Sequence, residues 1–210
     1  MADRKKRKKQ IPSGIRKVKS IKSLRALLQY HRIDFSSWGS GYTKNLSELM
    51  LEIREGESVL VVKRGTLIRQ TRHAQATITC VVDGVQLRLA EIRQEFSNGA
   101  VRTRKNTDRS TSEKLRADES PKAAMVRGIQ EELGLQQYDG EGLVRDVRRP
   151  RKRRGDSAAS YPNLSVEHVE FQFTWLMPDW LYVSSGYVEV QKRKKTYFEW
   201  KQIETASASL

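Results

Sequence analysis

One stretch, residues 113–135, constrains the fold more than any other part of the chain because both ends of a helix can be recognised in it. Ser120 can cap a free backbone N–H, and Pro121 has the fixed φ that suits the first helical position. Gly134 stands where a residue in the left-handed conformation ends a helix. The sequence therefore predicts a helix from about Pro121 to Leu133.

The faces of this helix differ in chemistry. Its apolar stripe, which should pack on a core, consists of Met125, Val126, Ile129 and Leu133. The flank beside the stripe carries two small residues and two carboxylates, namely Ala124, Gly128, Glu131 and Glu132, and Glu119 lies just before the helix. Clustered carboxylates suit a hard cation such as Mg²⁺ that bridges phosphates. A solvated acidic surface is the alternative.

The same 23 residues resemble the Nudix box, G-x5-E-x7-R-E-U-x-E-E-x-G-U, in which U is a bulky apolar residue. Seven of the nine signature positions match at the right spacing: Glu119, Arg127, Ile129, Glu131, Glu132, Gly134 and Leu135. Two positions differ, because Glu113 replaces the opening glycine and Gly128 replaces the glutamate after Arg127. The resemblance implies an α/β Nudix fold, in which a mixed β-sheet is sandwiched between α-helices.

For function, the resemblance implies hydrolysis of a nucleoside-diphosphate-linked compound with bound Mg²⁺ or Mn²⁺. Carried over to this chain, Glu131 and Glu132 match metal ligands, Glu119 supports the metal, and Arg127 orients the ligands. Gly128 can act neither as ligand nor as base, so hydrolysis should be slow unless Glu113, Glu119 or another carboxylate takes its place. The alternative is an inactive Nudix-fold module that binds nucleotide or nucleic acid.

Positive charge is concentrated in two segments, which accounts for nearly all of the net charge of +15. Residues 1–19 begin with the run Arg4 to Lys9 and should form a disordered tail, and residues 145–160 should form an exposed basic loop. Both segments could contact nucleic acid or serve only solubility. Neither interleaves aromatic residues with its cations, which argues against base stacking.

Basic residues also occupy the polar approach to the box. Residues 97–112 lack apolar periodicity and read as a loop. Arg102, Arg104 and Lys105 within it are candidates for binding substrate phosphate, and a mobile charged loop is the alternative.

The remaining chain divides into a helical extension at 20–54 and a Nudix-like domain at 55–205. Apolar spacing predicts one short helix after Ser20 and another from Asn45 to Arg54. Strands follow at 58–63, 66–71, 76–82 and 85–96, with a hairpin turn at Asp83-Gly84. Later strands include 169–175, and the candidates for an additional metal ligand beyond the box are Glu167, Glu170 and Glu189.

Cellular location is only weakly constrained. Cys80, the single cysteine, cannot form an internal disulfide and reads as a core residue, which is compatible with a reducing compartment. No apolar run is long enough to span a membrane. We expect a cytoplasmic protein, or a nuclear one if its source is eukaryotic, and the sequence leaves its oligomeric state open.

Overall fold

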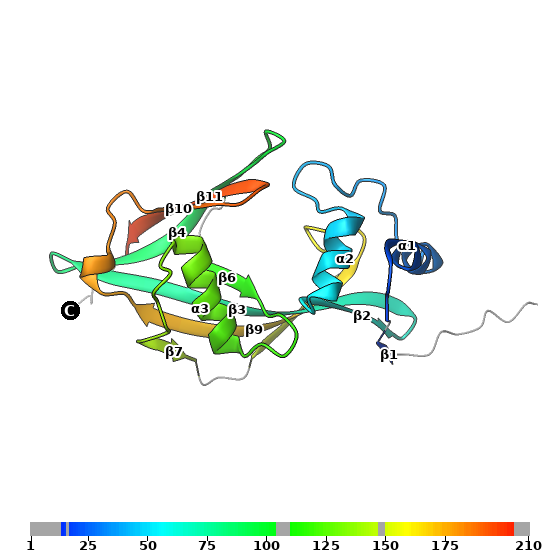
Figure 1. The fold of residues 1–210 in the computed structure, drawn as a ribbon, viewed down its shortest axis with the longest axis horizontal. Helices are drawn as coiled ribbons and strands as arrows, with labels where there is room; N and C mark the ends of the chain where they lie inside the picture. The colour runs from blue at the N-terminus through cyan, green and yellow to red at the C-terminus, as the bar shows by residue number, and fades with distance from the viewer. Residues whose placement is uncertain (1–13, 16, 104–109, 147–149, 204–210) are drawn as a thin grey trace, which may run out of the picture.

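The computed structural model describes residues 14–15, 17–103, 110–146 and 150–203 (Figure 1). The helices are α1 (Ile21–Tyr30), α2 (Leu46–Arg54) and α3 (Pro121–Leu133), with a short 3-10 turn, η1 (Asp179–Leu181). The strands are β1 (Gly14–Ile15), β2 (Ser58–Lys63), β3 (Thr66–Val82), β4 (Val85–Phe96), β5 (Val101–Thr103), β6 (Thr111–Lys114), β7 (Leu143–Arg145), β8 (Arg151–Gly155), β9 (Ser165–Leu176), β10 (Tyr187–Val190) and β11 (Lys194–Gln202).

Strand β3 is the centre of the sheet. It pairs antiparallel with β2, β4 and β6 and parallel with β9, so the sheet is mixed and the α/β class is confirmed. The expectation of two strands, at 66–71 and 76–82, was wrong. β3 runs without interruption for 17 residues because β9 pairs with it along residues 68–79, which supplies partners through the polar middle.

Two hydrophobic cores lie on opposite faces of this strand. Side chains alternate between the faces of a strand, so Leu67 projects opposite to Ala74 and Ala76. Leu67 packs in one core with residues of α1, α2 and β2, whereas Ala74 and Ala76 pack in the other core with α3. In Figure 1, α3 lies across β3 and β9, while α1 and α2 lie at the other end of the molecule.

The helix boundaries agree with the sequence signals. Ser120 caps α3 by accepting a hydrogen bond from the backbone N–H of Ala123, and Gly134 ends it in the left-handed conformation with φ 70°. Ser20 and Asn45 cap α1 and α2, each within a reciprocal capping box. The hairpin at Asp83-Gly84 is also confirmed.

The two stretches expected to be loops contain strands. In the basic segment 145–160, Arg151–Gly155 forms β8, which pairs antiparallel with Val166–Glu170 of β9. The sequence did not predict this strand, because its exposed side chains are mostly cationic and show no alternation of apolar and polar residues. In the stretch 97–112, β5 pairs with β4, and β6 begins at Thr111 against β3.

Some expectations fall outside the described part of the chain. Most of the basic tail, residues 1–13 and 16, lies there, and so do Arg104 and Lys105. The boundaries at 20, 55 and 205 remain predictions, although α1 and α2 share their core with β2, β3 and β9. Within the described residues, none of the helices is both long and apolar enough to cross a membrane.

A buried carboxylate joins α2 to the sheet. The side chain of Glu52 is 5% exposed and accepts hydrogen bonds from Arg69 at 2.6 Å, Lys114 at 2.7 Å and Lys44 at 2.8 Å. Ser58 donates a further hydrogen bond at 2.7 Å. Burial alone would raise the pKa of Glu52, but the three cations hold it far below the usual range.

Replacing Glu52 with Gln should therefore destabilise the protein strongly. The change leaves the Arg69 guanidinium, itself 5% exposed, without its counter-charge, so we expect the free energy of unfolding to fall by about 3–5 kcal/mol. Urea denaturation measures the change. Glu55→Gln, at an exposed position on the end of the same helix, is the control and should have little effect; equal losses in the two variants would contradict the prediction.

Candidate active site

Arg127 of α3 holds the acidic residues around the helix together. Its Nε and Nη2 atoms donate to the two carboxylate oxygens of Glu119, at 3.0 and 2.9 Å. Nη2 also donates to the backbone carbonyl of Lys114 at 2.9 Å, and Nη1 lies 3.0 Å from Oε1 of Glu113. Nη1 is 3.7 Å from Glu131, one helical turn later. One guanidinium thus joins the helix, the preceding loop and strand β6.

Glu113 lies directly over Gly128. A Cβ atom built on Gly128 would come within 2.9 Å of the Cβ of Glu113 and 3.3 Å of its Cγ. The two positions that depart from the Nudix box are therefore in contact, and each accommodates the other. The space that a side chain at 128 would fill is taken by a carboxylate side chain from β6.

A second acidic group surrounds Glu132. The hydroxyl of Thr111 donates to the Glu132 carboxylate, and the charges of Glu189 on β10 and Lys194 on β11 act on it. Glu189 is buried, and its Oε2 atom, 3.5 Å from Nζ of Lys194, has no hydrogen-bond partner within the part of the chain that the structure describes. Of the three later carboxylates proposed from the sequence, Glu189 is the one beside the helix, because Glu167 pairs with Lys63 and Glu170 with Arg153.

The carboxylates differ in how readily they ionise. Burial raises the pKa of Glu132 well above its usual range, and the negative charges of Glu189 and Glu113 raise it further. Burial also raises the pKa of Glu113 despite the attraction of Arg127. The pKa of Glu119 is lowered instead: the effect of its partial burial is outweighed by hydrogen bonds from Arg127 and the N–H of Arg116.

The residues expected to bind metal have different partners. Glu119 is engaged by Arg127, Glu131 is about half exposed, and Glu132 faces Thr111. Among the residues that the structure describes, no three acidic, histidine or cysteine side chains are placed to hold a metal ion together. Arg102, expected to bind substrate, lies in β5 opposite Gln94.

Sequence reasoning named Glu113 among the carboxylates that could replace the one absent at Gly128, but it did not predict that the two residues are in contact. The available signal was that glycine and glutamate are exchanged between the two positions: the residue absent at 128 appears at 113.

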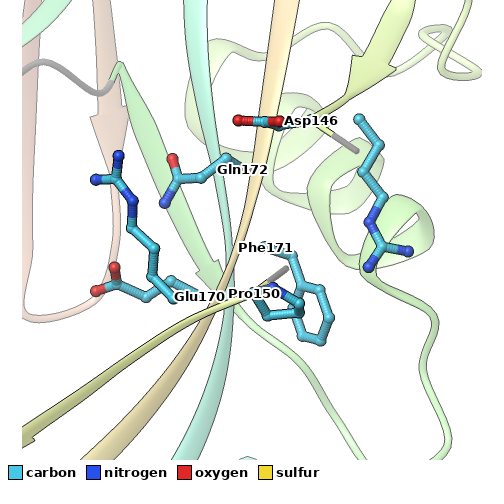
Figure 2. A pocket seen from close by; sticks show the side chains of 7 residues that line it. Asp146, Pro150, Glu170, Phe171 and Gln172 are labelled. Atoms are coloured by element: carbon cyan, nitrogen blue, oxygen red, sulfur yellow. The ribbon is translucent and has the colours of Figure 1, made fainter. Parts of the chain in front are cut away.

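Two cavities lie away from this cluster. The smaller, about 190 Å³, opens beside β9 between β7 and β8, and Asp146, Glu170 and Phe171 are among the residues that line it (Figure 2). The guanidinium of Arg145 lies 5.1 Å from the ring centre of Phe171. The larger, about 570 Å³, lies over β2, β3, β9 and β8.

Comparison with known proteins gives similarities to solved structures. No family model matches the sequence, and no curated protein matches it. The chain is similar in structure to two crystal structures of the C. elegans Ap4A hydrolase. The match to one covers 63% of this chain and 80% of the hydrolase chain, at 15% identity and a TM-score of 0.35. The match to the other, a binary complex, covers 63% of this chain and 78% of the hydrolase chain, at 15% identity and a TM-score of 0.34. A MutT/nudix family protein from Enterococcus faecalis is similar over 78% of this chain and 53% of its own, at 12% identity and a TM-score of 0.39.

Gly128→Ala tests the contact between Gly128 and Glu113. Glycine to alanine within a helix ordinarily raises stability by up to about 1 kcal/mol. Here we expect a loss of about 1–3 kcal/mol, because the new methyl group overlaps the stem of Glu113. In a Glu113→Gly background the same change should become stabilising. Glu113→Gln keeps the Cβ and Cγ atoms of the side chain, so in this control background Gly128→Ala should still lower stability. A gain in stability in Gly128→Ala alone would contradict the contact.

The raised pKa of Glu132 predicts a specific pH dependence. Between the unfolded pKa of about 4.3 and the higher folded pKa, the native state binds more protons than the unfolded state, so this group's contribution to stability falls as pH rises. In EDTA at neutral pH, Glu132→Gln, which mimics the protonated carboxyl, should therefore raise the free energy of unfolding. The gain should vanish below about pH 4. Thermal melts across pH measure it, with the half-exposed Glu131→Gln as control; a gain that persists at low pH would contradict this origin.

Proposed function

We propose that this protein is a divalent-cation-dependent hydrolase of the Nudix type, acting on a nucleoside-diphosphate-linked compound, in which Glu113 supplies the carboxylate absent at Gly128. The proposal rests on one observation: the side chain of Glu113 packs against Gly128, and its Oε1 atom lies 3.0 Å from Nη1 of Arg127. This keeps an acidic side chain beside the helix at the point where the box places one.

The donor set fits a hard cation in its chemistry. The charges of Glu189 and Glu113 both act on Glu132, whose protonated form is favoured chiefly by burial, and the buried Oε2 of Glu189 has no hydrogen-bond partner among the described residues. A cation would relieve the repulsion and satisfy that oxygen. Glu113, Glu132 and Glu189 would hold it, with Glu131 at the exposed side, once their side chains move toward the ion, because no such set is preassembled among the described residues. When bound, such an ion polarises a phosphoryl group and makes a bound water more acidic.

The residues around the cation would have distinct roles. Arg127 fixes Glu113 while Glu119 fixes Arg127 through two hydrogen bonds, so Glu119 is a positioning residue in this proposal. Oε1 of Glu113 is engaged by Arg127 and by the N–H of Lys114, whereas its Oε2 makes no hydrogen bond within the described residues and is free to meet a ligand. We expect slow turnover, because Arg127 competes with the cation for Glu113.

An inactive binding module is the second candidate. It is favoured by the lack of a preassembled set of three ligands in the described residues. The two candidates differ in a measurable way, because a module of this kind would show no product formation that depends on both metal and Glu132.

Hydrolysis assays on purified protein test the proposal. With Mg²⁺ or Mn²⁺ and either ADP-ribose or a dinucleoside polyphosphate, we expect phosphate-bearing products, and Glu113→Gln or Glu132→Gln should each lower kcat by at least about tenfold. Calorimetric titration with Mn²⁺ should show metal binding that is weakened in the same variants. Glu141→Gln, at an exposed position on a loop, is the control for a lost carboxylate.

The reciprocal exchange sharpens the test. Glu113→Gly combined with Gly128→Glu rebuilds the box arrangement and should retain or exceed the natural activity. Gly128→Glu alone should lose stability because two stems compete for one space. Activity that is absent from the natural chain and appears only in the double variant would leave the binding module as the better description.

A further inference from the structure

The larger cavity has the composition of an anion site. Its volume of about 570 Å³ is that of a typical small-molecule pocket. Five cationic side chains line it, namely Lys63, Arg72, Lys152, Arg153 and Arg154, against the two carboxylates of Glu57 and Glu167. The cavity therefore has a net positive lining.

Strand alternation collects most of these groups on one face of the sheet. Gln70 and Arg72 alternate in phase with Ala74, which faces α3, and Glu167 and Val169 pair with them from β9. Lys152 and Arg154 of β8 pair with Val169 and Glu167 and project to the same side. Helices α1 and α2 pack on the opposite face. The cavity is thus part of the face that also carries α3.

Three of the cations are available to a ligand. Lys63 is paired with Glu167, and Arg153 with Glu170. Arg72, Lys152 and Arg154 make no salt bridge within the described residues, although the charge of Arg154 acts on the carboxylate of Glu167. Arg72 is nonetheless held in place, because its Nη2 atom donates to the backbone carbonyl of Arg116 at 2.9 Å. Val59 and Val169, both half-buried, supply an apolar floor.

We propose that this cavity binds a phosphorylated small molecule of nucleotide size, with its phosphates between Arg72, Lys152 and Arg154. Guanidinium and ammonium groups are the side chains that bind phosphate in proteins. The apolar floor and the amide of Gln70 would contact the organic part of the ligand. This site uses none of the carboxylates of the α3 cluster, so it stands whether or not the protein hydrolyses its ligand.

A simpler role for the same charges is protection of a sheet edge. β8 pairs with β9 alone among the described strands, and charged side chains on such an edge discourage pairing with another chain. Edge protection needs charge but not a cavity, and it predicts no saturable ligand binding.

Calorimetric titration of the full chain with ADP in EDTA tests the proposal, with pyrophosphate as competitor. We expect saturable binding of one ADP per chain, displaced by pyrophosphate. Lys152→Ala combined with Arg154→Ala should raise the Kd at least tenfold, and Arg72→Gln should do so independently. The charge-matched control is Lys22→Ala combined with Lys192→Ala, at exposed positions outside the cavity, and it should leave the Kd unchanged.

The outcomes separate the explanations. Absence of saturable ADP binding, or equal weakening in the cavity and control variants, would overturn the proposal in favour of edge protection. Tighter binding of a ten-nucleotide oligouridylate than of ADP, with steep salt dependence, would make this a nucleic-acid surface and overturn it as well. The Glu132→Gln variant should bind ADP in EDTA as the natural protein does, because Glu132 lies outside the cavity. A failure of ADP binding can therefore be told apart from a failure of the proposed hydrolysis.

Discussion

The backbone hydrogen bonding of β3 is the constraint on which the rest of the structure depends. A strand of 17 residues needs partners along both edges, and four other strands supply them: β2, β4, β6 and β9. Because its side chains alternate, the same strand contributes to a core on each face of the sheet, one with α3 and the other with α1 and α2. Glu52 reinforces the joint, since its cations come from β3, from β6 and from the loop before α2.

The α3 cluster depends in turn on where β6 is placed by β3. Pairing of Glu113 with Ala74 fixes the strand under the helix, and Arg127 then reaches back to Glu113 and to the carbonyl of Lys114. The next residue, Lys114, projects to the other face and meets Glu52 and Glu57. Two consecutive side chains of one short strand therefore connect the candidate active site to the charged cluster behind the sheet.

How far the sequence predicted the structure depended on the range of the interactions involved. The ends of α3 follow from Ser120 and Gly134, because caps act within one turn. The contact between Glu113 and Gly128 joins residues 15 positions apart through tertiary packing, and apart from the exchange of glycine and glutamate between the two positions, no pattern in the sequence predicts it. β8 was missed for a different reason: it is an edge strand whose exposed cationic side chains carry none of the apolar alternation by which strands are recognised.

The contact between Glu113 and Gly128 also restricts how this chain can change. Two glutamates at these positions would compete for one space, and two glycines would leave it empty and remove the carboxylate. Each arrangement with one glutamate and one glycine is therefore separated from the other by an unfavourable intermediate, whichever substitution comes first. We therefore expect the two sites to be epistatic, because the effect of a substitution at either one depends on the residue at the other.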